Sequence, residues 1–468
     1  MGNSNKYVTL LSNTVVFAIG NVLVKVISFF LMPLYTAVLT TEQYGVSELL
    51  NSAIEIILPI GTLCVIEALY RFSIEKNANY KAIFANSIRI VLYGDIVVLL
   101  VCVLLKHIFN YGYAFSFFFL YLATTFYKLV TQFSRGLGHV KRYALYGVIN
   151  SLVLVLSNIL LLVWMNGGVR AYLASFTIGY GVSGIVAFFA SKEYRYISLT
   201  YKDKKLRNEM IRYSAPNIPN MLSWWINNIS DRYIIMFFWG AGLTGLYTAA
   251  SKLPAMINLF SAIFQQAWQY STAKEIENID RQVFFNKVFK IYSFGCLMAC
   301  SALLFLNRVV CKILLKDNFY NAWRFVPILI LAATLGCYST FFGTFYNALK
   351  KNFVLMLSTL IGAGINIILN FVLIPVYGGI GAAVATVISY VIITTLRIVD
   401  VTKRIGPIAD YKRLLVQFSL LFVITYITTA TESIISYLLG VLCLFIIIAL
   451  DYDTLKYSVK IMRQKFKR

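Results

Sequence analysis

The sequence predicts an all-α, polytopic membrane protein with 14 transmembrane helices: two six-helix lobes that form a parallel internal repeat, followed by two extra C-terminal helices. Three observations predict this fold. Hydrophobic residues make up 59% of the 468 residues and charged residues only 13%. Apolar runs of about 20 residues recur along the whole chain, and motifs of the first half return in the second. A soluble core stops growing at about 250–300 residues, so a soluble chain could not bury this much apolar surface.

The apolar runs define the expected spans. A helix that crosses about 30 Å of hydrocarbon requires about 20 mostly apolar residues. In chain order, such runs occupy residues 11–36, 46–70, 84–105, 113–134, 144–165, 171–191, 214–238, 244–270, 287–306, 325–347, 353–375, 380–399, 414–430 and 433–450. The first run is too long for the apolar region of a signal peptide and lacks a clear cleavage site, so we expect it to be retained.

Lysine and arginine set the expected orientation, because cytoplasmic loops carry an excess of both. With the N-terminus in the cytoplasm, the inner loops and termini collect 31 of the 42 basic residues and the outer loops collect 6. Both termini are therefore expected in the cytoplasm. The same asymmetry accounts for most of the net charge of +23 without a nucleic-acid partner. The loops are short, so the function is expected inside the membrane.

The second half of the chain repeats features of the first at spacings of about 200–212 residues. The paired positions are Gly45 with Gly245, Asn158 with Asn370, and Gly167-Gly168 with Gly378-Gly379. Six spans per unit place both copies in the same orientation, which predicts lobes related by an axis along the membrane normal. The expected domains are a lobe at 1–191, a basic cytoplasmic linker at 192–213, a second lobe at 214–399, and helices 13 and 14 with a basic tail at 400–468.

Besides Arg89, four basic residues lie within the apolar spans, where a charge costs about 2.5–3.5 kcal/mol and is a functional candidate by default. They are Lys25, Lys128, Arg232 and Lys252. The three lysines have no acidic neighbour at helical spacing. Each therefore either pairs with a carboxylate of another helix, as Lys25 with Glu55 or Asp95 would, or lines a wet cavity. A cationic cavity between the lobes would bind an anionic substrate group.

Acidic and amide residues within the spans supply further candidates. Glu55, Asp95 and Asp231 are candidates for uptake of a coupling ion, either a proton or Na⁺. Glu67 and Arg71 are four residues apart, a spacing that favours a structural ion pair on one helix face. Amide side chains gather in spans 1, 7 and 8, and those that could contact sugar hydroxyls are Asn21, Asn227, Asn228, Asn258 and Gln265. Packing between helices explains these amides equally well.

Metal, cofactor and enzyme chemistry have little support in the sequence. The two histidines, His107 and His139, are far apart, which makes a histidine-based metal centre or catalytic triad improbable. The seven cysteines mostly lie in apolar runs, where cysteine packs as a small hydrophobic residue. We therefore expect no cofactor, no metal and no enzymatic activity.

Four motifs in the expected order carry a family resemblance. Their strings run from Met32 to Gly45, from Gly136 to Tyr143, from Asp231 through Gly245 to Lys252, and from Asn366 to Pro375. On these residues the chain resembles the polysaccharide-biosynthesis membrane proteins, specifically the Wzx-type flippases for O-antigen and capsule units. These flippases belong to the multidrug/oligosaccharidyl-lipid/polysaccharide exporter superfamily.

The resemblance implies a function. Such proteins carry undecaprenyl-diphosphate-linked oligosaccharides from the inner to the outer leaflet of the bacterial cytoplasmic membrane. It implies two lobes around a cationic cavity, a groove for the lipid tail formed with spans 13 and 14, contact with membrane lipid, and cooperation with the polysaccharide polymerase machinery. Ion-coupled antiport is proposed for some relatives.

Two other functions compete with this interpretation. A drug/cation antiporter of the same superfamily would prefer cationic substrates, and the excess of basic over acidic residues in the spans weighs against it. A membrane glycosyltransferase or polymerase that acts on lipid-linked sugars would generally carry a large extracytoplasmic loop or an acidic catalytic pair, and the sequence shows neither.

Overall fold

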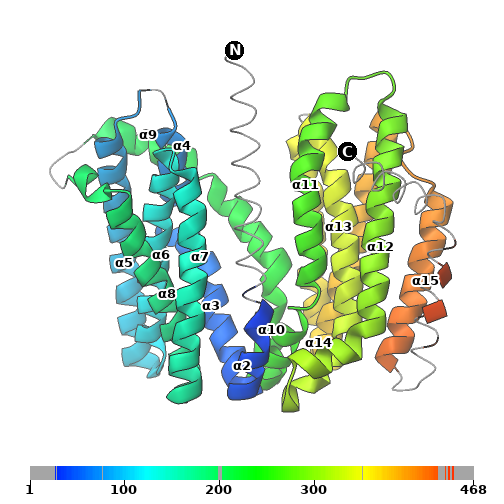
Figure 1. The fold of residues 1–468 in the computed structure, drawn as a ribbon, viewed down its shortest axis with the longest axis horizontal. Coiled ribbons are helices and arrows are strands. Elements are labelled where there is room, and N and C mark those ends of the chain that lie inside the picture. Colours follow the sequence, from blue (N-terminus) through cyan, green and yellow to red (C-terminus); the bar gives the residue numbers. More distant parts are fainter. Residues whose placement is uncertain are drawn as a thin grey trace, which may run out of the picture. The chain divides into compact units, whose positions relative to one another are not determined.

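The computed structural model describes residues 29–75, 77–198, 203–349 and 351–430, with a few single positions outside these ranges. Every regular element in the described ranges is a helix (Figure 1). The chain divides into two compact units, Met1–Ile229 and Ser230–Arg468. The boundary falls within helix α10 (Asn217–Ala250). The assignment of residues 192–213 as the linker between lobes stays a prediction.

The first unit contains most of the elements from α2 to α10 (Figure 1). They are α2 (Met32–Val38), α3 (Thr41–Gly61), α4 (Val65–Ser73), α5 (Tyr80–Phe109), α6 (Ala114–Gly136), α7 (Val140–Asn158), the π-helix η1 (Ile159–Trp164), α8 (Gly168–Ala190), the 3-10 helix η2 (Glu193–Tyr196) and α9 (Lys204–Ser214). Helix α8 packs on α6 and α7, while α4 packs on α5, α6 and α9.

The second unit begins inside α10. Its further elements are α11 (Ala255–Glu275), α12 (Arg281–Leu314), the 3-10 helix η3 (Asp317–Arg324), α13 (Val326–Ala348), α14 (Asn352–Ile405) and α15 (Tyr411–Ala430). Helix α13 is the centre of this unit, because it packs on α11, α12, α14 and α15 and nearly all its residues are buried. Trp268 of α11 stacks on Phe341 of α13 with ring centroids 4.5 Å apart.

The described helices agree with the predicted membrane spans. Nine of them are long and apolar enough to cross a membrane, or ten if the bent pair α3 and α4 is one span. Helix α14 contains the predicted spans 353–375 and 380–399, joined by a kink at Gly378. The predicted span 433–450 and most of 11–36 lie outside the described residues. The all-α polytopic fold is confirmed, and a total of 14 spans is consistent with these helices.

Glycines turn the chain where consecutive spans meet. Gly378 in α14 has φ 56° and Gly240 in α10 has φ 78°, values in the left-handed region that side chains other than glycine rarely adopt. Gly168, at the start of α8, has φ 57°. Each Gly-Gly pair that the repeat matched therefore contains one left-handed glycine, which is the second residue of the pair at 167–168 and the first of the pair at 378–379.

Two expected placements of arginine are wrong. Arg71 forms its ion pair with Glu75 at 3.1 Å, one turn further along, rather than with Glu67. Arg397, assigned to a basic inner loop by charge counting, is buried in α14. Its guanidinium donates to the backbone and hydroxyl oxygens of Ser339 and to the hydroxyls of Ser358 and Thr359. These neutral acceptors tie α14 to α13.

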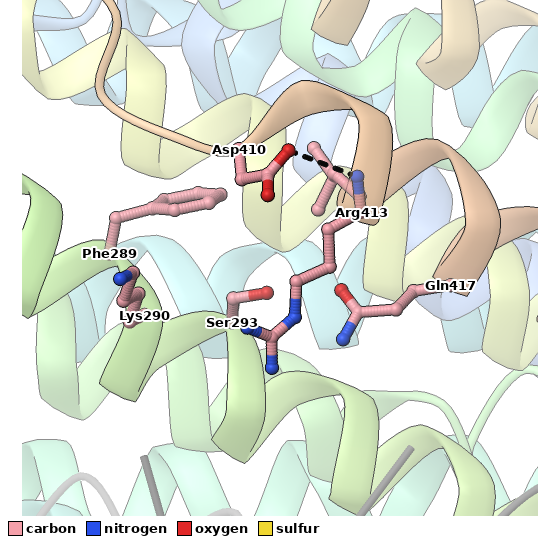
Figure 2. Close-up of a pocket in the computed structure, with 7 residues that line it drawn as sticks. Phe289, Lys290, Ser293, Asp410, Arg413 and Gln417 are labelled. Carbon is pink, nitrogen blue, oxygen red and sulfur yellow. Dashed lines mark hydrogen bonds between the residues drawn. The ribbon is translucent and has the colours of Figure 1, made fainter. Parts of the chain in front are cut away.

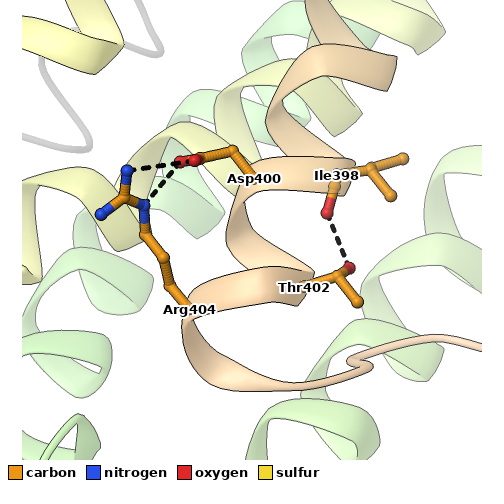
Figure 3. Close-up of polar contacts among 4 residues, drawn as sticks. All are labelled: Ile398, Asp400, Thr402 and Arg404. Atoms are coloured by element: carbon orange, nitrogen blue, oxygen red, sulfur yellow. Dashed lines mark hydrogen bonds and ion pairs between the residues drawn. The ribbon is translucent and has the colours of Figure 1, made fainter.

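The last turns of α14 show the behaviour expected of exposed charges. Arg404 donates twice to the carboxylate of Asp400, at 2.7 and 3.0 Å, and the Thr402 hydroxyl donates to the Ile398 carbonyl at 2.6 Å (Figure 3). Both charged side chains are about one-third exposed, at 35% and 30%. The pair therefore contributes little stability beyond its effect on this helix end.

Gly94→Ala tests the tight packing of α5 on the end of α3. A Cβ at Gly94 would overlap the backbone carbonyl of Gly61, which cannot rotate away. We expect a loss of about 1–3 kcal/mol of stability, seen as a lower thermal unfolding temperature in detergent. The control is Gly181→Ala in α8, where nothing lies within 4 Å of the added Cβ. Equal unfolding temperatures for the two variants would contradict this packing.

Glu193→Gln tests a buried acid outside the predicted spans. Glu193 in η2 is fully buried, neither carboxylate oxygen has a hydrogen-bond partner, and burial raises the pKa of the carboxyl from 4.5 to about 9. Between these values the folded chain keeps a proton that the unfolded chain loses. Stability therefore falls as the pH rises through this window, by up to about 1.4 kcal/mol per pH unit.

We expect Glu193→Gln to flatten the dependence of the unfolding temperature on pH, most clearly on the alkaline side of neutrality. Glu209→Gln, an exposed acid of α9, is the matched control and should keep the wild-type slope. A wild-type slope in Glu193→Gln would show that this carboxyl is ionised in the folded protein.

Candidate functional site

The predicted cationic residues fall into three situations. Lys25 and Asn21 lie outside the described residues. Lys128 on α6 is accessible, and its electrostatic partners are Glu55 on α3 and Glu67 on α4. Both partners lie on other helices of the first unit. The role of Lys128 in binding a substrate stays a prediction.

The structure brings the other two predicted cationic positions together in the second unit. Arg232 lies in α10, and its guanidinium donates to the Ser251 hydroxyl at 3.2 Å. Ser251 precedes Lys252 in the turn that leads, through Pro254, into α11. Arg232 and the turn bearing Lys252 therefore form one partly buried basic site, although the two residues are 20 apart in sequence.

A partly buried carboxylate adjoins this basic site. The Tyr247 hydroxyl donates to Asp231 at 2.5 Å, and the Arg232 backbone N–H donates to the other carboxylate oxygen at 2.9 Å. Asp231 and Arg232 leave α10 in directions about 100° apart, so the carboxylate faces Tyr247 while the guanidinium faces Ser251. Opposite charges thus occupy adjacent positions with separate partners.

Polar residues of α14 extend the Asp231 cluster. Thr386 interacts with the Tyr247 hydroxyl, and the Asn366 amide donates toward Thr386 at 3.5 Å. Asn370 donates to Asn366 at 2.9 Å, while its own buried Oδ1 has no hydrogen-bond partner. A chain of oxygen-bearing side chains therefore runs from Asp231 to an unsatisfied amide oxygen. Such oxygens are the ligands that a proton or a hard monovalent cation requires.

The first unit holds a related cluster that sequence reasoning missed. Asn158, the repeat partner of Asn370, is also fully buried and also leaves Oδ1 without a partner, while its amide donates to the Tyr35 hydroxyl at 3.1 Å. Nearby, Tyr172 and Tyr44 donate to Glu48 at 2.7 and 3.3 Å. The signal was present in the sequence, since Glu48 is an acid within a predicted span, as Glu55 is.

The remaining predicted residues are dispersed. Asp95 is buried in α5 with Oδ1 unpartnered. Asn228 and Asn258 are exposed, while the side chain of Asn227 lies outside the described residues. Gln265 is buried in α11 and accepts a hydrogen bond from Thr344 of α13 at 2.8 Å. In this conformation Gln265 serves packing, and contact of these amides with sugar stays a prediction.

Two pockets of the described chain are lined by other residues. One, of about 30 Å³, lies between α12 and α15 and holds about one water (Figure 2). Its lining residues are Phe289, Lys290, Ser293, Asp410, Arg413, Leu414 and Gln417. The other, of about 410 Å³, is an open hollow of the first unit beside Gln43 and Arg170. Among the described residues no cluster of His, Cys, Asp and Glu could hold a metal ion.

Two curated proteins that resemble this sequence are described as probable flippases. Two relatives come from Haloferax volcanii. The probable low-salt glycan biosynthesis flippase Agl15 is 27% identical over 43% of this chain and 43% of its own length, and the probable flippase AglR is 24% identical over 64% and 63%. The chain thus aligns with less than two thirds of either relative.

Solved structures show the same fold. The lipid II flippase MurJ in an inward closed conformation superposes with a TM-score of 0.66 over 94% of this chain and 99% of its own, at 17% identity. An inward-facing multidrug resistance transporter of the MATE family superposes with a TM-score of 0.63 over 81% and 95%, at 12% identity.

The model of one family, described as polysaccharide biosynthesis protein, matches residues 10–269, more than half of the chain. This match includes the motifs from Met32 to Gly45 and from Gly136 to Tyr143, and it ends beyond the one that closes at Lys252. The resemblance that the motifs carry is thereby confirmed. This multi-pass membrane protein belongs to the polysaccharide biosynthesis protein family.

Proposed function

We propose that the protein is a flippase that moves undecaprenyl-diphosphate-linked oligosaccharides from the inner to the outer leaflet of a bacterial cytoplasmic membrane. The observation that carries this proposal is the partly buried basic site of the second unit, where Arg232 lies beside the turn bearing Lys252. Family membership and relatives that are themselves described as flippases support it.

The chemistry of the substrate matches such a site. A diphosphate is a compact, multiply charged anion, and its transfer through hydrocarbon is prohibitive unless cationic side chains replace its water. The guanidinium of Arg232 offers a planar pair of donors for phosphate oxygens, and the ammonium of Lys252 adds a second charge. Lys25 and Lys128 act in the same way in this proposal, while Asn228 and Asn258 contact the sugars and the lipid tail stays in the bilayer.

Alternating access then moves the head group. The two lobes first open to the cytoplasm, and their rocking exposes the bound head group to the outside. Uptake of a cation at Asp231 changes the net charge directly beside Arg232, and the oxygens of Tyr247, Asn366 and Asn370 serve that uptake. Binding of the coupling ion therefore alters the affinity of the basic site for diphosphate, which is the differential interaction that a transport cycle requires. Glu55 and Asp95 are further coupling candidates.

The double variant Arg232→Gln/Lys252→Gln tests the substrate site. We expect translocation to slow at least tenfold, because each lost charge-assisted contact to phosphate is worth about 1.5–3 kcal/mol. The measurement follows fluorescent lipid-linked glycan in proteoliposomes, where a membrane-impermeant quencher reports the outer leaflet. Lys312→Gln, an exposed cation of α12, is the control. Unchanged translocation in the double variant refutes the diphosphate site, and transport of cationic dyes alone would support the drug antiporter.

Asp231→Asn tests coupling. We expect this variant to translocate at a rate that no longer depends on an imposed ion gradient, because it cannot change charge. Tyr247→Phe should shift the dependence about tenfold in ion concentration, because the ionised carboxylate loses one donated hydrogen bond. Separate proton and Na⁺ gradients identify the ion, and Asp317→Asn, an exposed aspartate, is the control. Gradient-driven translocation in Asp231→Asn that matches wild type would place coupling elsewhere.

A further inference from the structure

The second predicted span of the chain is broken. Helices α3 and α4 meet at an angle of 65°. Between them Leu63 and Cys64 adopt φ 50° and 53°, the left-handed region that branched or bulky residues enter only at a steric cost. Hydroxyl groups satisfy the carbonyls at the break, since Thr62 donates to Leu58 and Ser214 donates to Leu63, each at 2.8 Å. The break is thus a built feature of the first unit.

Helices α5 and α6 pack directly against this break. Gly94 of α5 lies directly against the backbone of Gly61, the last residue of α3, with no room for a side chain. The hydroxyl of Tyr121, from α6, contacts Gly61 as well, so a side chain there would meet it. Any change in the angle between α3 and α4 therefore displaces Tyr121 or α5.

Two buried polar groups beside the break lack partners. Asp95, the residue after Gly94, is 7% exposed and its Oδ1 accepts no hydrogen bond. The Tyr121 hydroxyl is fully buried and is also unpartnered. One is an acceptor and the other a donor, and they interact electrostatically without bonding. Unsatisfied groups of complementary type in an apolar interior favour a second arrangement in which they bond.

Few other groups act on Asp95 and Tyr121. Thr125, one turn further along α6, interacts with the Tyr121 hydroxyl without forming a hydrogen bond that satisfies it. From the break itself, the Cys64 thiol faces the Pro59 carbonyl. Further along α3, Glu55 interacts with Lys128 of α6. Among the described residues, no charged side chain of α3, α4 or α6 acts on Asp95, and burial dominates its environment. The two unpartnered oxygens of Asp95 and Tyr121 are too few ligands for a metal ion. A proton requires only one acceptor.

We propose that Asp95 is a proton-binding site that sets the angle between α3 and α4 through Tyr121. Ionised Asp95 draws the Tyr121 hydroxyl into a hydrogen bond and so removes it from Gly61, which lets the break change its angle. Protonated Asp95 leaves Tyr121 against Gly61, the arrangement seen here. The proton comes from water and returns to it. Coupling of this proton to glycan movement rests on the proposed function, whereas the proton site itself does not.

Infrared difference spectroscopy tests proton binding. The full chain in lipid nanodiscs is compared at acidic and alkaline pH, with every variant built on Glu193→Gln because Glu193 also titrates. We expect a carbonyl stretching band of a buried protonated carboxyl that Asp95→Asn abolishes. Tyr121→Phe should shift the pH at which the band appears, since the ionised carboxylate loses its hydrogen-bond partner, and Asp317→Asn should preserve the band. A spectrum of Asp95→Asn identical to that of the Glu193→Gln parent would overturn the proposal.

Hydrogen–deuterium exchange tests the hinge. After correction for intrinsic pH dependence, exchange across residues 58–66 should change about tenfold with pH in the Glu193→Gln parent, the size expected for one hydrogen bond to a charged group. Asp95→Asn should show a single, pH-independent rate. Tyr121→Phe keeps the ring packing and carries the test if Asp95→Asn does not fold. A pH response that persists in Tyr121→Phe would exclude the hinge.

Neither measurement includes substrate, so both are independent of the flippase proposal. If Asp95 passes both tests but Asp95→Asn responds to a pH gradient in translocation as wild type does, coupling at this residue is excluded and the flippase function stands. If no glycan moves in any variant, the flippase proposal fails and the proton site is unaffected.

Discussion

Hydrocarbon does not hydrogen-bond, and the rest of this structure depends on that fact. Each backbone or side-chain polar group within a span must be satisfied by the protein itself. The pattern is visible wherever a helix breaks or a charge is buried. Thr62 and Ser214 supply donors for the carbonyls at the break after α3. Arg397 finds five oxygen acceptors on α13 and α14 and no carboxylate among them. Serine and threonine hydroxyls take the place of water.

Because most buried polar groups form hydrogen bonds, each buried group without a partner calls for an explanation. Asp95, Tyr121, Asn158 and Asn370 each leave a buried oxygen without a partner. Asn158 and Asn370 are the repeat-paired asparagines, and in each unit a carboxylate–tyrosine hydrogen bond accompanies the asparagine, through Glu48 in one and Asp231 in the other. The internal repeat thus preserves local chemistry as well as helix order. The two units differ in the residues next to the carboxylate. Arg232 follows Asp231 in the second unit, whereas Ser47 and Leu49 flank Glu48 in the first.

The fold and the charge of the candidate site together limit which functions the protein can have. The likeness to MurJ and MATE structures at 17% and 12% identity establishes a shared fold, which hosts both flippases and drug exporters. The choice between them therefore rests on the chemistry of the site. In the proposed function, the paired basic positions at Arg232 and Lys252 bind an anionic head group beside the carboxylate of Asp231. The polar oxygen chain from Asp231 to Asn370 offers the means to change that charge during a cycle.

The sequence by itself determined the all-α membrane fold, the positions of the spans and the repeat, because apolar run length and glycine signals act locally along the chain. It also located Asp231 and Arg232 as charges within the spans, and both are partly buried in the structure. Only the tertiary structure showed which residues the charged and polar side chains contact. Glu67 and Glu75 both lie four residues from Arg71, and Arg71 forms its ion pair with Glu75. Arg397 lies in the predicted span 380–399, but only the structure showed that its acceptors are Ser339, Ser358 and Thr359. Gln265 accepts a hydrogen bond from Thr344 of α13, and its contact with sugar stays a prediction. Periodicity tells which face of a helix a residue occupies, but the neighbour it meets there depends on contacts between segments far apart in the chain.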